Sequence, residues 1–251
     1  MILNLKSFRR SIYFLMVVLP GCKPSEVKYE QPVVDNKLLL VVDQSKSVDF
    51  VSKSTIVEDV LLNTFQTTYK NVTCPTAFYR ATITGESNVV ALSTPFRQVV
   101  PDEESMGAVS YRQKYAEWRS AKRKWITDGI EDLKKTIYAT KSGSTDVYGI
   151  FKCVELTANK MKPADTLHLV FFSDMKHSMK GYELMDSLRS KTPALFARNE
   201  FKRLAIKQIT DKLYCLVTIV TPGNFKKSDV VVAYWESFFK EWGLTSNIDW
   251  R

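Results

Sequence analysis

The chain has 251 residues, of which 45% are hydrophobic and 25% are charged. This length and balance suit one large globular domain or two small ones, and they exclude a disordered or low-complexity chain. The formal net charge is +9, but residues 1–21 hold three basic and no acidic residues, so the remainder carries a moderate +6. A charge of that size is ordinary for a solvated protein surface.

The first 21 residues predict an export signal. Residues 1–10 are basic, and the apolar stretch 11–19 is too short to span a bilayer. The sequence Leu19-Pro20-Gly21-Cys22 resembles the lipobox of bacterial lipoprotein signal peptides, which implies lipidation of Cys22 with palmitate. The alternative is an ordinary secretory signal in which Cys22 is incidental. Both interpretations place the mature chain outside the cytoplasm.

Residues 22–36 are polar and contain Pro24 and Pro32, and we interpret them as a tether to the membrane. The resemblance implies a membrane-anchored lipoprotein of the cell envelope. Lys23 stands where an aspartate would favour retention in the inner membrane. For a Gram-negative source we therefore favour the periplasmic side of the outer membrane.

Three further cysteines, Cys74, Cys153 and Cys215, lie in the rest of the chain. They predict either one disulfide with a free thiol or three buried thiols. The two histidines, His168 and His177, have no metal-ligand spacing to a cysteine, which argues against a zinc site.

Residues 37–251 predict one domain in which strands and helices alternate. The first strand, 38–43, is a continuous apolar run that ends in Asp43-Gln44-Ser45-Lys46-Ser47. A helix capped by Ser54 or Thr55 should extend to residue 69, followed by strands at 77–83 and 89–92 that pair back on each other. Residues 93–108 predict a long surface loop, and its length makes it a candidate for specificity.

A long helix is expected from residue 109 to 138, with Gly129 as a candidate break. Aromatic and basic residues interleave between Trp118 and Trp125, which raises the question of nucleic acid. The two tryptophans are seven residues apart, however, and so share one helical face. We interpret this face as a core stripe beside a solvated basic face, and we expect no nucleic-acid partner.

The second half repeats the alternation. A turn at 142–146 opens a helix that ends at Pro163, and the apolar strand 166–173 is closed by Asp174. Helical segments follow at 182–190 and 197–210, then a strand at 213–221, a helix capped by Ser228 or Asp229, and a short edge strand within 244–250. Three strands are apolar on both faces, as in parallel sheets. We therefore predict an α/β fold: a doubly wound, mostly parallel central sheet with helices on both faces and one antiparallel edge strand.

Three loops should then meet at the carboxyl edge of the sheet, where open α/β sheets bind ligands. They bring together five side chains that offer only oxygen: Asp43, Ser45, Ser47, Thr145 and Asp174. Such a set suits a hard divalent cation. The structural alternative is that Ser45, Ser47 and Thr145 are only turn and capping residues.

The same residues, in this order, resemble the metal-ion-dependent adhesion site of von Willebrand factor type A (vWA) domains. The resemblance covers residues 37–250. It implies that Ser45, Ser47 and Thr145 ligate the cation, Mg²⁺ with Mn²⁺ or Ca²⁺ as alternatives. Asp43 and Asp174 would support the site from behind. A partner protein would complete the coordination with an Asp or Glu. Asp146 is expected to cap a helix rather than to bind metal.

The sequence does not predict an enzyme. It contains no Gly-x-x-x-x-Gly-Lys-Ser/Thr phosphate loop and no Gly-x-Ser-x-Gly nucleophile elbow. A hydrolytic set built from Ser173 or Ser178, Asp174 and His177 would be crowded into one loop. A second hypothesis is a structural envelope protein that binds an anionic polymer or lipid through a basic helical face, Arg112, Lys114, Arg119 and Arg123, with the metal only stabilising the fold.

Overall fold

We analysed a computed structural model of the chain. It describes residues 36–46, 48–70, 77–85, 90–139, 143–158, 161, 165–209, 214–222, 229–244 and 248–251. The chain divides into two units, Met1–Val33 and Val34–Arg251, and every element described belongs to the second. The proposed signal peptide, Cys22, nearly all of the tether, Ser47 and Cys74 lie outside the described residues.

The central sheet has six strands in the order β3-β2-β1-β4-β7-β8. These are β1 (Asn36–Asp43), β2 (Tyr79–Ile83), β3 (Val90–Leu92), β4 (Thr166–Phe172), β7 (Tyr214–Val220) and β8 (Asp249–Trp250). All neighbours pair in parallel except β2 and β3, so the antiparallel edge predicted from residues 89–92 is present. The order reverses between β1 and β4, which makes their carboxyl ends the topological switch point.

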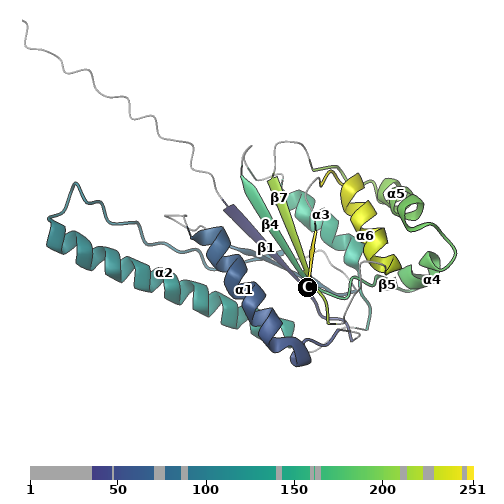
Figure 1. The fold of residues 1–251 in the computed structure, drawn as a ribbon, viewed down its shortest axis with the longest axis horizontal. Helices are drawn as coiled ribbons and strands as arrows, with labels where there is room; N and C mark the ends of the chain where they lie inside the picture. The colour runs from purple at the N-terminus through teal and green to yellow at the C-terminus, as the bar shows by residue number, and fades with distance from the viewer. Residues whose placement is uncertain are drawn as a thin grey trace, which may run out of the picture. The chain divides into compact units, whose positions relative to one another are not determined.

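Helices cover both faces of this sheet (Figure 1). Leu38, Leu40 and Val42 of β1 pack with α1 (Ser54–Tyr69) and the C-terminal half of α2 (Ala108–Ile137). Leu39 and Val41 point to the opposite core, which contains residues of α3 (Val147–Ala158), α4 (Leu184–Leu188), α5 (Pro193–Leu204) and α6 (Val230–Glu241). The fold is therefore the doubly wound α/β class, and the apolar run of β1 is buried on both faces as the sequence predicted.

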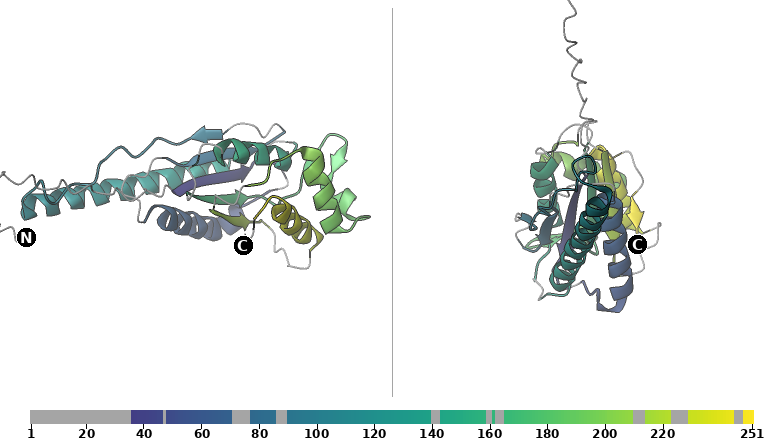
Figure 2. Two further views of the ribbon diagram at one scale, coloured as in Figure 1. Left: turned by 90° about the horizontal axis from the view of Figure 1, so that it is seen from above. Right: turned by 90° about the vertical axis from the view of Figure 1, so that its left-hand side faces the viewer.

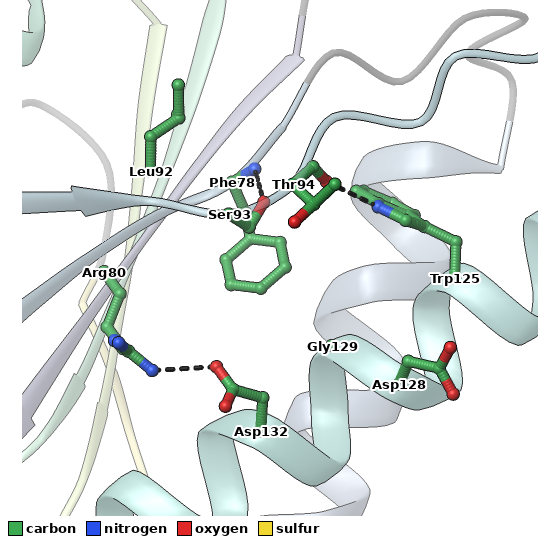
Figure 3. Close-up of a pocket in the computed structure, with 9 residues that line it drawn as sticks. All are labelled: Phe78, Arg80, Leu92, Ser93, Thr94, Trp125, Asp128, Gly129 and Asp132. Atoms are coloured by element: carbon green, nitrogen blue, oxygen red, sulfur yellow. Dashed lines mark hydrogen bonds and ion pairs between the residues drawn. The ribbon is translucent and has the colours of Figure 1, made fainter.

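Helix α2 is continuous for 30 residues, so the break expected at Gly129 is wrong. A Cβ at Gly129 would lie 3.0 Å from Cε1 of Phe78, so the glycine permits close packing of α2 on Phe78, the residue before β2 (Figure 3). The segment before α2 runs back along the helix: the indole nitrogens of Trp118 and Trp125 donate to the carbonyls of Gln98 and Thr94, at 3.3 and 2.8 Å. Figure 2 shows this segment beside the helix.

Two other local predictions need correction. A 3₁₀ turn, η1 (Val51–Lys53), precedes α1. The N-cap of α1 is Lys53 rather than Ser54 or Thr55, and its side chain makes no capping hydrogen bond. The segment expected to be helical from residue 182 begins with a two-stranded hairpin, β5 (Ser178–Met179) and β6 (Tyr182–Glu183), before the short α4. The hairpin forms because the loop after β4 folds back on itself through a turn at Gly181, whose φ is +79°.

Cys153 and Cys215 are buried thiols and form no disulfide within the described part of the chain. Among the described residues, no helix has the length and apolarity needed to cross a membrane.

Candidate functional site

Asp43 is the last residue of β1 and is fully buried, with 0% of its surface exposed. Its Oδ1 accepts the backbone N–H of Ser45 at 2.8 Å, which closes the turn after the strand. Its Oδ2 accepts the hydroxyl of Ser173 at 2.7 Å, across the switch point from β1 to the end of β4. Burial raises the pKa of Asp43, while the hydrogen bonds from Ser173 and Ser45 oppose this shift.

Asp174 follows Ser173 and is 2% exposed. Its Oδ1 accepts the backbone N–H of Lys176 at 3.0 Å, and the Lys176 ammonium lies 3.7 Å from Oδ2. The negative charge of Asp174 contributes to the raised pKa of Asp43, which means that the two buried carboxylates repel each other. The switch point thus holds two acidic side chains away from water.

Thr145 is 3% exposed and is held against the same loop by its backbone. Its N–H donates to the carbonyl of Ser178 at 2.8 Å, and the N–H of Ser178 donates back at 2.9 Å. The N–H of Asp146 donates to the carbonyl of Thr84, just beyond β2, at 2.8 Å. The segment that carries Thr145 is therefore fixed both to the loop after β4 and to the end of β2.

The structure thus brings Asp43, Ser45 and Asp174 to the adjacent ends of β1 and β4, and it attaches Thr145 to the loop that carries Asp174. Ser47 lies outside the described residues. Ser173 also belongs to this cluster, and the sequence pattern alone does not reveal it. The register of β1 on β4 pairs Val42 with Phe172, and the following residues are then Asp43 and Ser173. Only this register could have revealed the contact.

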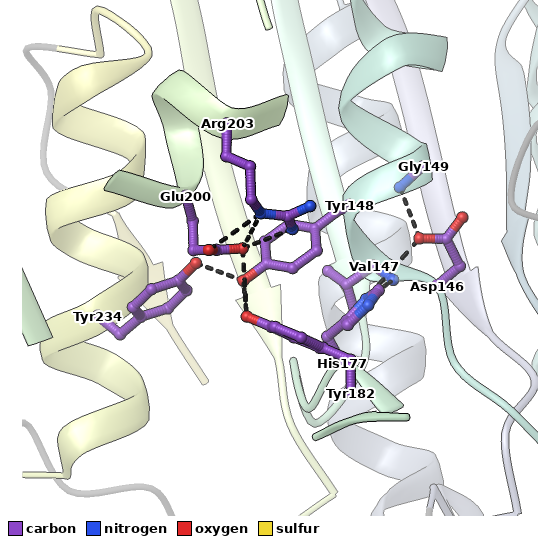
Figure 4. Close-up of polar contacts among 9 residues, drawn as sticks. All are labelled: Asp146, Val147, Tyr148, Gly149, His177, Tyr182, Glu200, Arg203 and Tyr234. Atoms are coloured by element: carbon purple, nitrogen blue, oxygen red, sulfur yellow. Dashed lines mark hydrogen bonds and ion pairs between the residues drawn. The ribbon is translucent and has the colours of Figure 1, made fainter. Parts of the chain in front are cut away.

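Asp146 and His177 organise the start of α3 (Figure 4). Oδ1 of Asp146 accepts the N–H of Gly149 at 2.9 Å, which is the capping contact expected of Asp146. Nδ1 of His177 accepts the N–H of Val147 at 3.1 Å and so carries no proton there. Burial lowers the pKa of His177, consistent with a neutral ring. Both side chains thereby satisfy N–H groups that the helix itself leaves without partners.

A buried polar network continues from α3 to the outer helices (Figure 4). The hydroxyls of Tyr148 and Tyr234 share a short hydrogen bond, and that of Tyr182 donates to Oε2 of Glu200 at 3.2 Å. Arg203 completes the network with a 2.6 Å contact from Nη2 to Glu200. Burial raises the pKa of both Tyr148 and Tyr234, so their phenols stay protonated. This network fixes α3, α5 and α6 behind the candidate site.

The donor set fits a hard divalent cation. No group of three or more His, Cys, Asp or Glu side chains in the described part of the chain is arranged to hold a metal. A cation at the switch point would therefore depend on two carboxylates and on neutral hydroxyls. All of these are oxygen donors, as Mg²⁺, Mn²⁺ and Ca²⁺ prefer.

No protein-family model matches the sequence, and no curated protein matches it. Three solved structures that match the chain are distant from it in sequence. Proximal thread matrix protein 1 from the mussel byssus is 13% identical with a TM-score of 0.39, and the match covers 82% of this chain and 41% of that one. Manganese-loaded Plasmodium vivax TRAP protein is 13% identical with a TM-score of 0.37, covering 87% and 68%. Human COPII-coat protein Sec24c is 11% identical with a TM-score of 0.41, covering 86% and 29%.

This chain therefore spans about two fifths of the mussel protein's length. Identities and scores this low carry no information about what the chain binds.

Proposed function

We propose that the protein is a binding module that captures an acidic side chain of a partner protein through a divalent cation at the switch point. One observation carries this proposal: Asp43 and Asp174, both buried, stand at the ends of the neighbouring strands β1 and β4, among hydroxyl groups. Two ionised carboxylates in such a place are costly unless a cation is present. A divalent cation would supply the missing charge and a coordination position for the partner.

The resemblance to vWA domains suggests how the residues would share this work. Ser45, Ser47 and Thr145 would hold the cation through neutral hydroxyls. Asp43 and Asp174 would orient those hydroxyls and balance the charge, and Ser173 would orient Asp43. Because neutral groups would make the direct contacts, the cation would keep its attraction for an outside carboxylate. Mg²⁺ is the first candidate, with Mn²⁺ and Ca²⁺ as alternatives, and we propose no catalytic step.

We also propose that the protein is exported and anchored in the cell envelope through a lipid on Cys22. The motivating feature is the basic and apolar leader that ends in Leu19-Pro20-Gly21-Cys22. Labelling with radioactive palmitate tests this anchor. We expect incorporation into the wild-type chain and none into Cys22→Ser; equal labelling of both would reject it.

Calorimetry on the purified full chain tests the cation site. We expect saturable binding of Mg²⁺ or Mn²⁺ at or below millimolar concentration, lost in Asp43→Asn. Asp186→Asn is the matched control, because it removes one exposed carboxylate of the same domain. A pull-down from envelope extract, with and without EDTA, then tests partner capture. Absence of metal binding, or binding that survives Asp43→Asn, would contradict the proposal.

A further inference from the structure

A groove of about 850 Å³ lies between the C-terminal half of α1 and α2, within the size range of ligand-binding clefts. Its walls are apolar and aromatic: Leu62 from α1, and Tyr115, Trp118 and Ile126 from α2. The proposed cation site is at the other edge of the sheet. Asn36, the first residue of β1, donates from Nδ2 to the carbonyl of Thr68 at 3.0 Å, so the end of α1 that lines the groove lies at the amino edge.

The groove is strongly positive. Four cationic side chains, Lys70, Arg119, Lys122 and Arg123, are among the described residues that line it, and none of those residues is acidic. In the hollow on the β2 side of α2, by contrast, the charged side chains are paired with one another or with a neighbour (Figure 3). There Arg80 forms a 2.8 Å ion pair with Asp132. The other acidic residue that lines the hollow, Asp128, pairs with Lys124 at 3.0 Å. The positive groove therefore suits an anion, whereas the balanced hollow does not.

Lys122 is the most unusual of the four cations, because it lies in the buried stripe of α2 with only 8% of its surface exposed. Its ammonium is 5.1 Å from the centroid of the Trp118 ring, a cation–π distance. Burial lowers the pKa of this lysine, because desolvation opposes its charged form. An anion bound beside it would favour that charged form.

The aromatic wall is preformed. Trp118 stacks on Tyr115 with centroids 5.7 Å apart and an interplanar angle of 22°, and Tyr115 stacks in turn on Tyr111 at 5.6 Å and 26°. Phe96 meets Trp118 edge-on at 6.3 Å. The ring faces are thus occupied by one another, which disfavours the base stacking used to bind single-stranded nucleic acid. Ring edges and aliphatic side chains suit an acyl chain.

We propose that this groove binds an anionic lipid, with the acyl chain along the aromatic wall and a phosphate or carboxylate headgroup at Lys70, Arg119, Lys122 and Arg123. The site is independent of the cation site. Its position is consistent with a membrane partner, because the chain enters the domain at Asn36 on the same edge of the sheet. If Cys22 is lipidated as proposed above, the 14 residues from there to Asn36 can span at most about 50 Å.

Titration of the purified full chain with dodecyl phosphate, followed by tryptophan fluorescence and calorimetry, tests this site. Three further ligands are titrated for comparison. Laurate carries a carboxylate in place of the phosphate, inorganic phosphate lacks the alkyl chain, and dodecyl maltoside lacks the charge. We expect dodecyl phosphate and laurate to bind at least about tenfold more tightly than inorganic phosphate or dodecyl maltoside, because the charged headgroup and the apolar chain each contribute to binding. EDTA should leave this binding unchanged, which separates its outcome from that of the cation site.

Variants locate the site. Arg119→Gln with Arg123→Gln should weaken dodecyl phosphate binding about tenfold. Arg112→Gln with Lys135→Gln removes the same charge from exposed positions of α2 outside the groove. This control should change the affinity for dodecyl phosphate less than about twofold. Lys122→Met keeps the apolar stem and should also weaken binding, while a thermal melt checks that it folds. The proposal would be overturned if both double variants lost binding equally, or if dodecyl maltoside bound as tightly as dodecyl phosphate. Displacement of dodecyl phosphate by a single-stranded oligonucleotide or an acidic peptide would also overturn it.

Discussion

The hydroxyl of Ser173 donates a 2.7 Å hydrogen bond to the carboxylate of Asp43, and this contact joins the ends of the two central strands. The two residues are 130 positions apart in the chain. Ser173 also accepts the N–H of Met175 at 2.8 Å, so the same hydroxyl fixes the start of the loop that carries Asp174. The position of one acid of the candidate site therefore depends on the position of the other.

Replacing Ser173 by alanine should destabilise the domain by about 1–3 kcal/mol, because it removes a donor from a buried carboxylate. Urea unfolding in the absence of metal measures this loss. Ser237→Ala serves as the control: its hydroxyl bonds the carbonyl of Ala233 within helix α6, and we expect a change below about 0.5 kcal/mol. Equal effects of the two substitutions would contradict the role given to Ser173.

Asp43→Asn should separate folding from cation binding. The amide oxygen can still accept the N–H of Ser45, and the amide nitrogen can donate to the Ser173 oxygen in place of accepting from it, while the repulsion from Asp174 is removed. In EDTA we expect a thermal midpoint equal to or above that of the wild type. Saturating Mg²⁺ should raise only the wild-type midpoint, with about 2.7 kcal/mol of stabilisation at 100 times the dissociation constant. A metal-dependent rise in Asp43→Asn would show that the cation binds elsewhere.

Lys176→Met should strengthen cation binding. The Lys176 ammonium lies 3.7 Å from Oδ2 of Asp174 and competes with a cation for that carboxylate. Because the lysine side chain is 45% exposed, the gain should be at most about fivefold, which is the contribution of a surface ion pair. Lys180→Met, an exposed change of the same charge in the same loop, should have less effect. Calorimetric titration of both variants provides the comparison.

The phenol pair at the centre of the buried network is expected to be energetically coupled. Tyr148→Phe and Tyr234→Phe should each destabilise the domain by about 1–3 kcal/mol. The first removes the hydrogen bond to the Tyr234 hydroxyl, and the second leaves the Tyr148 hydroxyl with only its 3.5 Å contact to Tyr182. The double variant should cost less than the sum of the single ones. Chemical denaturation of the four proteins gives this cycle; strict additivity would show that the hydrogen bond contributes nothing.

Acid should destabilise the domain through its two buried histidines. Burial lowers the pKa of His168 and of His177 in the folded chain. The unfolded chain therefore binds more protons once the pH falls through about 6.5, and the free energy of unfolding falls with it. Each histidine can add at most about 1.4 kcal/mol per pH unit to this slope. His168→Gln and His177→Gln should each flatten the profile between pH 7 and 5, measured by urea unfolding at each pH.

The sequence by itself determined the class of the fold and most of its elements. Continuous apolar runs predicted β1, β4 and β7, because only strands covered on both faces are apolar throughout. The spacing of apolar residues predicted α2 within one residue at each end. The same patterns placed Asp43 and Asp174 just where the two central strands end, since an acid closes each buried run.

Only the tertiary structure decided which distant residues meet. Strand register placed Ser173 on Asp43, and packing placed Tyr148 against Tyr234, 86 residues away. The groove between α1 and α2 depends on how two amphipathic helices lie on one sheet face, and the helical period does not encode that arrangement. Lys122 belongs to the buried face of α2, and only the packed helices show that its ammonium lies over Trp118 among other cations.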